Sequence, residues 1–381
     1  MASTLILGGG FGGLATATAL RERLPEEHEI VVVDARESFA MGLRKPWEIV
    51  GIGTLAAGSR ARGTLDDRGI NFVQGEISAI DPGQRTATVN GEPLSGDHLV
   101  VALGAQSRPD LVPGFEDHAH DAWDTSGIPA LRTAFEQFDG GRIVVAVTGM
   151  PYTCPPAVYE IAMLIEEALR ERELRDASEI FVSTPAPILL PVLGKEGSAA
   201  LGEQLDARRI AHSVERKVER IEQHRVVYAD GDQEFDLMIG APPHRVPDVV
   251  ADSGLTGDGG WVPVDRATLQ TEAEGVFAIG DVTHIPIGDG LALPKAGGFA
   301  ETEGEHVAAL IAADVLGEPA PDPYGGEGFC FVEMGRNQAA FVEGSFFAEP
   351  GPSVGLRLPE GEQADEKRSW EAERLARWFG E

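Results

Sequence analysis

The chain has 381 residues and carries 62 aspartates and glutamates against 31 lysines and arginines, which gives a net charge of −31. A surface this acidic repels polyanions and excludes nucleic acid as a partner. The length exceeds the roughly 250–300 residues that one hydrophobic core usually serves, so we expect two or three domains. Two cysteines are too few for a framework of structural disulfides.

The first 34 residues predict a βαβ unit that binds a dinucleotide. Gly8, Gly10 and Gly13 form a G-x-G-x-x-G motif between an apolar strand and a helix. The first glycine allows the tight turn, the second lets the backbone approach a pyrophosphate, and the third allows close packing of helix on strand. The phosphates would bind at the helix N-terminus. Asp34 ends the second strand, where its carboxylate can accept hydrogen bonds from ribose hydroxyls. The alternative is a glycine-rich turn without a ligand.

The N-terminal residues enter this strand directly, without the basic and apolar regions of a signal peptide, and no run of 18 apolar residues follows. We therefore expect a cytoplasmic protein without a transmembrane span. Residues 35–58 are rich in Gly, Pro and aromatic residues and predict a loop that reaches over a ligand. Residues 71–79 and 86–90 predict antiparallel strands around a D-P-G-Q turn, and residues 99–105 predict a buried strand that ends in small residues.

Residues 142–147 predict the first strand of a second dinucleotide-type unit, but no second glycine motif follows. Prolines lack an N–H group and cannot build a phosphate cradle, so the site for a nicotinamide dinucleotide is lost while the fold is kept. Cys154 lies between this strand and a helix N-terminus, an electropositive setting that lowers the pKa of a thiol. The residues that replace the close-approach glycines are Met150, Pro151, Cys154, Pro155 and Pro156.

The C-terminal part follows a Pro-rich linker at residues 317–323 and carries the second cysteine, Cys330. Alternating apolar residues predict two strands near residues 329–332 and 339–342. Residues 365–381 predict an amphipathic helix, which either docks on the chain's own body or a dimer mate, or contacts a membrane interface. Its apolar residues are Trp370, Leu375, Trp378 and Phe379.

Three segments together resemble the FAD domain of the two-dinucleotide-domain flavoproteins: the glycine motif, the strand at residues 99–105 and the sequence at residues 271–281. The resemblance implies that Ala102 and Gly104 pack near FAD, and that Gly280 and Asp281 bind it, with the aspartate on the ribityl hydroxyls. It also implies an α/β fold with two Rossmann-like domains. The first domain is discontinuous, with residues 1–105 and 265–320; the second spans 106–264, and a flavin-facing segment spans 321–381.

The flanks of the two cysteines resemble those of the sulfide dehydrogenase group, namely sulfide:quinone oxidoreductases and the flavoprotein subunit of flavocytochrome c sulfide dehydrogenase. This resemblance makes Cys154 and Cys330 a redox pair on one face of the isoalloxazine. It implies that Glu160 is a base near the pair, unless its side chain faces solvent. Lys295 would lie beneath the flavin pyrimidine and stabilise the reduced ring, unless it forms a surface ion pair.

Two departures from the group matter. The chain lacks the third cysteine of many quinone-reducing members, and it has Ala40, Met41 and Gly42 where flavocytochrome relatives attach FAD to a cysteine. We therefore expect FAD to be bound without a covalent link. The histidines show no metal-ligand spacing, so no metal site is expected.

The sequence thus predicts an FAD enzyme that oxidises sulfide to sulfane sulfur or polysulfide through Cys154 and Cys330, with a quinone as acceptor. Attachment to the inner face of the cell membrane would follow if the terminal helix contacts lipid. Three alternatives remain: an NAD(P)H oxidoreductase similar to type II NADH dehydrogenases, a soluble sulfide dehydrogenase with a protein acceptor, and a flavin redox sensor without turnover.

Overall fold

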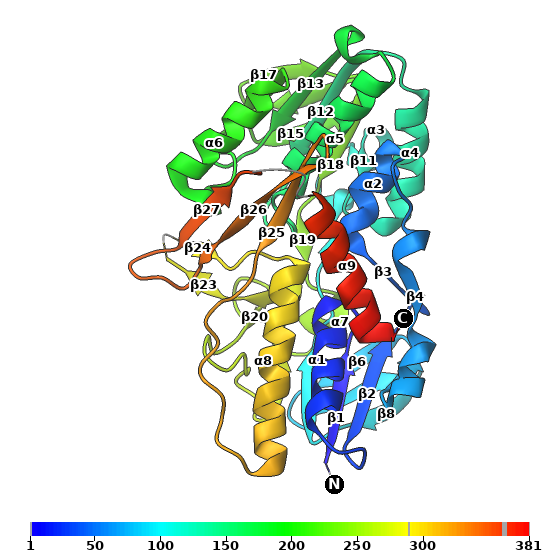
Figure 1. Cartoon of the computed structure of the whole chain (residues 1–381), viewed down its shortest axis with the longest axis vertical. Coiled ribbons are helices and arrows are strands. Elements are labelled where there is room, and N and C mark those ends of the chain that lie inside the picture. Colours follow the sequence, from blue (N-terminus) through cyan, green and yellow to red (C-terminus); the bar gives the residue numbers. More distant parts are fainter. Residues whose placement is uncertain (1, 289, 360–363, 381) are drawn as a thin grey trace.

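A computed structural model describes residues 2–288, 290–359 and 364–380 of the chain. Two five-stranded parallel sheets form the centres of two lobes, which occupy the lower and upper halves of Figure 1. The C-terminal helix α9 (Ala364–Phe379) crosses the front of the molecule where the lobes meet. Two Rossmann-like units were predicted from the sequence, and this arrangement confirms them.

The first sheet has the strand order β21-β9-β1-β2-β5. Its central strands are short apolar runs buried on both faces, as is typical of parallel sheets covered by helices. Strand β21 comes from the second half of the chain, so the unit is discontinuous, as predicted. The strands are β1 (Ser3–Leu7), β2 (Glu29–Asp34), β5 (Asn71–Gln74), β9 (His98–Val101) and β21 (Val276–Ala278).

Helices α1 (Phe11–Arg23) and α8 (Gly297–Leu316) pack against each other on one face of this sheet. The contact is close because it is made by small residues. A Cβ atom on Gly304 would lie 2.5 Å from the carbonyl oxygen of Gly12 and 2.8 Å from Thr16 Oγ1. The N-termini of both helices therefore stand side by side near the carboxyl ends of the strands.

The second sheet has the order β11-β18-β12-β13-β14. The helix predicted after its first strand is α5 (Ala157–Glu171), whose apolar face is buried. The strands are β11 (His120–Asp121), β12 (Gly141–Val147), β13 (Ser178–Ser183), β14 (Ile210–Ser213) and β18 (Leu237–Ala241); helices α4 (Ile128–Gln137) and α6 (Gly194–Ala207) complete this lobe.

Two details differ from the prediction for residues 35–90. Residues 71–74 do not belong to the antiparallel add-on: they form β5, which pairs in parallel with β2. The segment predicted as a loop contains a helix, α2 (Lys45–Val50), which begins with Pro46 in its first turn and ends at Gly51 with φ +83°. It also contains the pair β3 (Ser38–Ala40) and β4 (Ser59–Ala61).

Small antiparallel sheets and short elements fill the remainder. The C-terminal sheet has a third strand beyond the two predicted, and its members are β25 (Cys330–Gly335), β26 (Gln338–Ser345) and β27 (Ser353–Arg357). The others are β6 (Ile77–Asp81), β7 (Thr86–Val89), β8 (Glu92–Ser95), β10 (Gln106–Ser107), β15 (Val218–Glu222), β16 (Arg225–Tyr228), β17 (Gly231–Glu234), β19 (His244–Arg245), β20 (Val262–Pro263), β22 (Thr283–His284), β23 (Pro286–Ile287), β24 (Leu291–Ala292), α3 (Phe115–His118) and α7 (Asp248–Ala251).

Among the residues that the structure describes, no helix combines the length and the apolar character needed to cross a bilayer.

Candidate functional site

The three glycines of the first motif occupy three different environments. A Cβ atom on Gly13 would lie 1.8 Å from the carbonyl oxygen of Gly8, so this position sets the distance between α1 and β1. Gly8 has φ +104°, a conformation that favours glycine. A Cβ atom on Gly10 would meet nothing within 4 Å, which leaves open space in front of the helix N-terminus. The motif therefore has the geometry of a phosphate-binding turn.

Asp34 holds this turn in place. Its Oδ2 atom accepts a hydrogen bond of 3.0 Å from the Gly9 N–H and forms a 3.2 Å ion pair with Arg62. Arg62 is 1% exposed, and its Nε donates to the Gly9 carbonyl oxygen at 2.9 Å. No sequence pattern marks Arg62, because a single arginine in an irregular segment gives no local signal.

The other residues implied by the flavoprotein resemblance lie at the same edge of the sheet. Ala102 follows β9 and donates its N–H to the Leu7 carbonyl oxygen at 2.7 Å, while a Cβ atom on Gly104 would meet nothing within 4 Å. Gly280 follows β21 and donates its N–H to Glu303 of α8. Parallel pairing of β21, β9 and β1 brings these positions together.

Asp281 gives the clearest test of whether a cofactor fits here. Its Oδ1 atom is buried and has no hydrogen-bond partner among the described residues. Buried polar groups normally have partners, so this oxygen calls for a hydroxyl or N–H donor from a ligand. The unpartnered Asp281 oxygen and the open space at Gly10 and Gly104 together fit an extended ligand with hydroxyl and phosphate groups, such as FAD. Burial also raises the pKa of the Asp281 carboxyl.

The turn between β12 and α5, residues 148–156, is built around Cys154 instead of a phosphate cradle. Cys154 has φ +47°, and its N–H donates to the Lys295 carbonyl oxygen at 2.7 Å. The indole N–H of Trp123 donates to the Thr153 carbonyl oxygen at 2.6 Å. The N–H groups of Ala157 and Glu160 bond to carbonyl oxygens within the turn. The N–H of Cys154 is therefore bonded within the protein.

Cys154 and Cys330 lie close enough for their charges to interact, although 176 residues separate them in the sequence. Cys330 begins β25 and is buried, Cys154 is half-buried, and both are free thiols. The charge of one thiolate acts on the other, since ionisation of Cys154 raises the pKa of Cys330.

The pKa of the Cys154 thiol differs from the sequence-based expectation. The helix N-terminus was expected to lower the pKa of Cys154. Burial instead raises it to about 12, and the nearby Glu160 carboxylate adds to the effect. Desolvation penalises the thiolate more than one helix terminus can stabilise it. The thiol form therefore dominates in this state of the protein.

Glu160 faces the protein interior and not solvent. It is 4% exposed and bonded to Lys367 of α9, which is itself 1% exposed. Lys367 Nζ also donates to Glu333 Oε2 of β25 at 3.0 Å, and the Trp47 indole N–H donates to the same oxygen at 2.5 Å. We call Glu160, Lys367 and Glu333 the buried relay. Burial raises the pKa of Glu160 to about 7, and the Glu333 charge contributes, whereas Lys367 opposes the shift.

Lys295 lies between the cysteine turn and the cofactor edge, by which we mean the edge of the first sheet that carries Gly280 and Asp281. Its Nζ donates to the carbonyl oxygens of Asp281, at 2.9 Å, and of Thr283, and lies 3.7 Å from the centre of the Trp261 ring. The alternative of a surface ion pair is therefore wrong. Burial lowers the pKa of Lys295 to about 8. Lys45, which no sequence pattern marks, donates to the Trp123 carbonyl oxygen, and its charge acts on both Cys154 and Asp281.

The apolar residues of α9 pack on the chain's own body, as one of the two alternatives predicted. Trp370 stacks on Phe11 at a ring distance of 5.9 Å, and Trp378, fully buried, contacts Phe11 and Phe39 edge-on. Leu375 and Phe379 are buried as well. The membrane alternative is wrong for these four side chains, because none of them is available to lipid.

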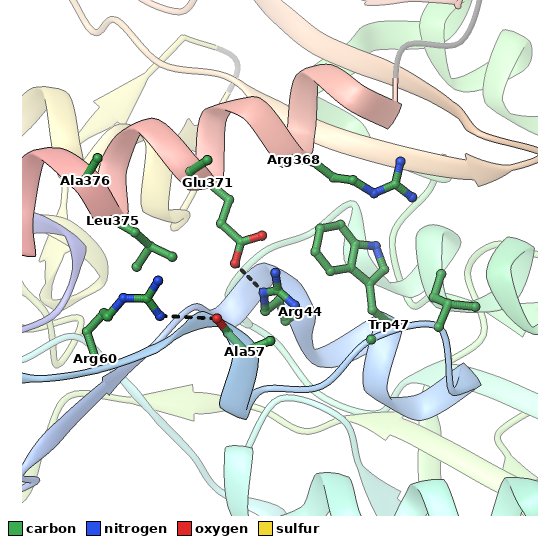
Figure 2. A pocket seen from close by; sticks show the side chains of 11 residues that line it. Arg44, Trp47, Ala57, Arg60, Arg368, Glu371, Leu375 and Ala376 are labelled. Atoms are coloured by element: carbon green, nitrogen blue, oxygen red, sulfur yellow. Dashed lines mark hydrogen bonds and ion pairs between the residues drawn. The ribbon is translucent and has the colours of Figure 1, made fainter. Parts of the chain in front are cut away.

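A cavity of about 500 Å³ separates the outer face of α9 from α2 and the segment that follows it (Figure 2). Trp47 and Ala57 line one side, and Glu371 and Leu375 of α9 line the other. Glu371 is bonded to Arg44 across the cavity. Because Trp47 also bonds Glu333, one indole ring separates the buried relay from this cavity.

The arrangement matches known proteins. The family model of pyridine nucleotide-disulphide oxidoreductases matches residues 2–303. The chain is 25% identical over 300 residues to a mitochondrial sulfide:quinone oxidoreductase of Mus musculus. The matched region covers 74% of this chain and 66% of the mouse protein, just under two thirds of its length. The chain is 28% identical over 384 residues to a sulfide-quinone reductase of Aquifex aeolicus, covering 91% and 83% of the two chains.

A type II NADH:quinone oxidoreductase of Staphylococcus aureus is 24% identical over 356 residues, covering 87% of this chain and 85% of that one. In structure, the sulfide:quinone oxidoreductase of Aquifex aeolicus superposes with a TM-score of 0.88 at 23% identity, over 100% of this chain and 92% of the other. The protein is therefore an oxidoreductase with a flavin cofactor. The chain belongs to the pyridine nucleotide-disulphide oxidoreductase family.

Proposed function

We propose that this protein oxidises sulfide with FAD as cofactor, Cys154 and Cys330 as the sulfur-handling pair, and a quinone as electron acceptor. One observation carries the proposal: the turn that should bind a nicotinamide dinucleotide instead carries Cys154, whose thiol interacts electrostatically with Cys330 and with the buried Glu160. The relatives named as sulfide:quinone oxidoreductases support the same substrate and acceptor.

The oxidised form of the pair is a disulfide between Cys154 and Cys330. Hydrosulfide attacks the Cys154 sulfur and breaks the S–S bond, which leaves a persulfide on Cys154 and a thiolate on Cys330. A second hydrosulfide removes the outer sulfur as hydrogen disulfide, which passes one proton to a cysteine and leaves as HSS⁻. The remaining thiol and thiolate return to the disulfide, which releases two electrons and that proton. The sum is 2 HS⁻ → HSS⁻ + H⁺ + 2 e⁻.

Bound FAD would accept the two electrons and pass them to the quinone. The residues that would hold it are the glycine turn with Asp34, the small residues Ala102 and Gly104, and Asp281, whose buried oxygen needs a donor. Glu160 would accept the proton, because its raised pKa matches that of a base that works near neutral pH. Lys295 orients Asp281 through the backbone carbonyl that it binds.

An anaerobic titration tests the proposal. Sulfide should bleach the bound flavin, while NADH should not. Cys154→Ser and Cys330→Ser should retain flavin and lose the bleaching by sulfide. Acid denaturation should release all the flavin, because no covalent link is expected. Bleaching by NADH alone would favour the NADH dehydrogenase that the Staphylococcus relative suggests. Bleaching by neither reductant would leave a redox sensor.

A further inference from the structure

One peptide bond of the cysteine turn is held at both of its ends. The carbonyl oxygen of Thr153 accepts a 2.6 Å hydrogen bond from the indole N–H of Trp123. The N–H of Cys154 donates a 2.7 Å hydrogen bond to the carbonyl oxygen of Lys295. This carbonyl group and this N–H belong to the same planar peptide unit, which joins Thr153 to Cys154. Two partners from distant parts of the chain therefore fix the orientation of the peptide that leads into Cys154.

The backbone of Cys154 needs this support because it is strained. Its φ is +47°, in the left-handed region that residues other than glycine rarely occupy. Such a conformation persists only where the surrounding contacts impose it. On the other side, the carbonyl oxygen of Cys154 accepts a 3.0 Å hydrogen bond from the N–H of Ala157. With the peptide units on both sides of Cys154 bonded, the Cα–Cβ bond that carries the sulfur has a fixed direction.

Trp123 is itself held in place by its neighbours. Its backbone N–H donates to Asp121 Oδ1 at 2.7 Å, and its carbonyl oxygen accepts a hydrogen bond from the ammonium group of Lys45. Its ring is buried and meets the ring of Tyr152 edge-on at a distance of 6.0 Å. The Tyr152 hydroxyl in turn donates to the carbonyl oxygen of Pro155 at 3.3 Å. The indole N–H is therefore a donor with a fixed position, aimed at the residue before Cys154.

We propose that Trp123 is a positioning residue of the sulfur site. Its indole N–H and the Lys295 carbonyl oxygen form a clamp that holds Cys154 in the left-handed conformation, from which its sulfur closes the disulfide with Cys330. This inference rests on the proposed function for the identity of the cysteine pair. Without the indole N–H, the peptide turns and Cys154 relaxes to a negative φ, which moves its side chain. A disulfide tolerates a narrow range of positions of the two residues, so its closure becomes less favourable.

The first experiment measures the redox equilibrium of the cysteine pair in the flavin-loaded protein, without oxygen. Two molecules of glutathione reduce the disulfide to two thiols and become one glutathione disulfide, and thiol labelling with mass spectrometry gives the oxidised fraction. Trp123→Phe keeps an aromatic ring and removes the N–H donor. Its disulfide should be roughly tenfold less stable than that of the wild type, which corresponds to a reduction potential about 30 mV higher.

Trp378→Phe is the matched control for this experiment. It shortens another buried tryptophan, whose indole N–H has no hydrogen-bond partner among the described residues. The control therefore loses the same atoms from a buried site without losing a hydrogen bond to the cysteine turn. It should leave the equilibrium with glutathione at the wild-type value.

A second experiment tests the clamp without sulfide and without a disulfide. Cys154→Gly and Cys154→Ala are each made with Trp123 and with Trp123→Phe, and urea unfolding compares the four proteins. Glycine occupies the left-handed region without strain, whereas alanine does not. With Trp123 present, the glycine variant should have a folding equilibrium constant roughly fivefold above that of the alanine variant. With Trp123→Phe, residue 154 relaxes and this gap should close, which a tryptophan that only packs would not produce.

The outcomes separate this inference from the proposed function. If sulfide does not bleach the flavin, but Trp123→Phe weakens the disulfide and closes the gap, the proposed function is rejected and the clamp stands. Equal disulfide stability in Trp123→Phe and the wild type, or an unchanged gap, overturns the clamp. An equal loss in Trp378→Phe also overturns it, because the effect would then follow from the loss of any buried indole. A wild-type protein that forms no disulfide at any glutathione ratio rejects both the cysteine pair and the clamp.

Discussion

The backbone N–H of Cys154 donates a 2.7 Å hydrogen bond to the carbonyl oxygen of Lys295. Through its ammonium group, Lys295 also holds the carbonyl oxygens of Asp281 and Thr283. The cysteine turn and the loop that carries Asp281 are therefore tied to one residue. A substitution at Lys295 should therefore affect both the sulfur site and the cofactor edge.

Lys295→Met should weaken this connection. It leaves two carbonyl oxygens without their donor, and hydrogen bonds to a charged group contribute about 1.5–3 kcal/mol each. We expect a lower melting temperature and faster loss of flavin, measured by thermal unfolding and by flavin fluorescence after gel filtration. Lys195→Met removes an exposed lysine of α6 and serves as the control. Equal flavin retention in both variants would contradict the role given to Lys295.

Gly13→Ala and Gly10→Ala should separate folding from cofactor binding. The alanine at position 13 would bring its Cβ to 1.8 Å from a backbone oxygen, so the helix must move away from β1. The alanine at position 10 meets open space within the protein and should leave the unfolding midpoint unchanged. It should nevertheless lower flavin affinity, because the methyl group occupies the approach to the phosphates. Urea unfolding and flavin titration of the apoproteins measure the two effects.

Glu303 predicts a pH dependence of stability. Burial raises its pKa from 4.5 to about 7 in the folded protein. Between these values the folded state binds more protons than the unfolded state, so this group makes stability fall as pH rises through the window. Glu303→Gln should remove the fall, which is on the order of 3 kcal/mol. Urea midpoints at about pH 5 and about pH 8 measure it.

The control for Glu303 is Glu318→Gln, which changes an exposed carboxylate just after α8. It should keep the wild-type difference between the two pH values. If Glu303→Gln also keeps that difference, the carboxyl titrates normally and the buried position given to it is wrong.

Trp378→Ala should destabilise the protein by about 3–5 kcal/mol, the usual loss for a buried aromatic side chain. Trp378 is fully buried between Phe11 and Phe39, so its removal leaves a cavity over the start of α1. Leu316→Ala removes a side chain that is 45% exposed and should change stability little. Urea unfolding compares the two, and a similar small effect of both would mean that α9 docks only loosely.

The local sequence was sufficient for the elements that depend on neighbouring residues. The first βαβ unit, the positions of Gly8 and Gly13, and helix α5 could be predicted because a positive φ, a close backbone approach and an apolar face leave a signal within one short stretch. The helix α2 was missed because a short proline-initiated helix among Gly and aromatic residues resembles a loop locally.

Only the tertiary structure decided what α9 contacts and how the pKa values of the ionisable groups shift. An amphipathic helix with Trp and Phe has the same pattern whether it contacts lipid or protein, so burial of Trp378 needed the complete fold. Glu160 and Lys367 are 207 residues apart, and no local pattern joins them. The pKa of Cys154 depends on how much water the surrounding elements exclude. By itself, the sequence determined which groups could carry charge, and the packing determined which charged forms are stable, because desolvation depends on all the elements that meet at the site.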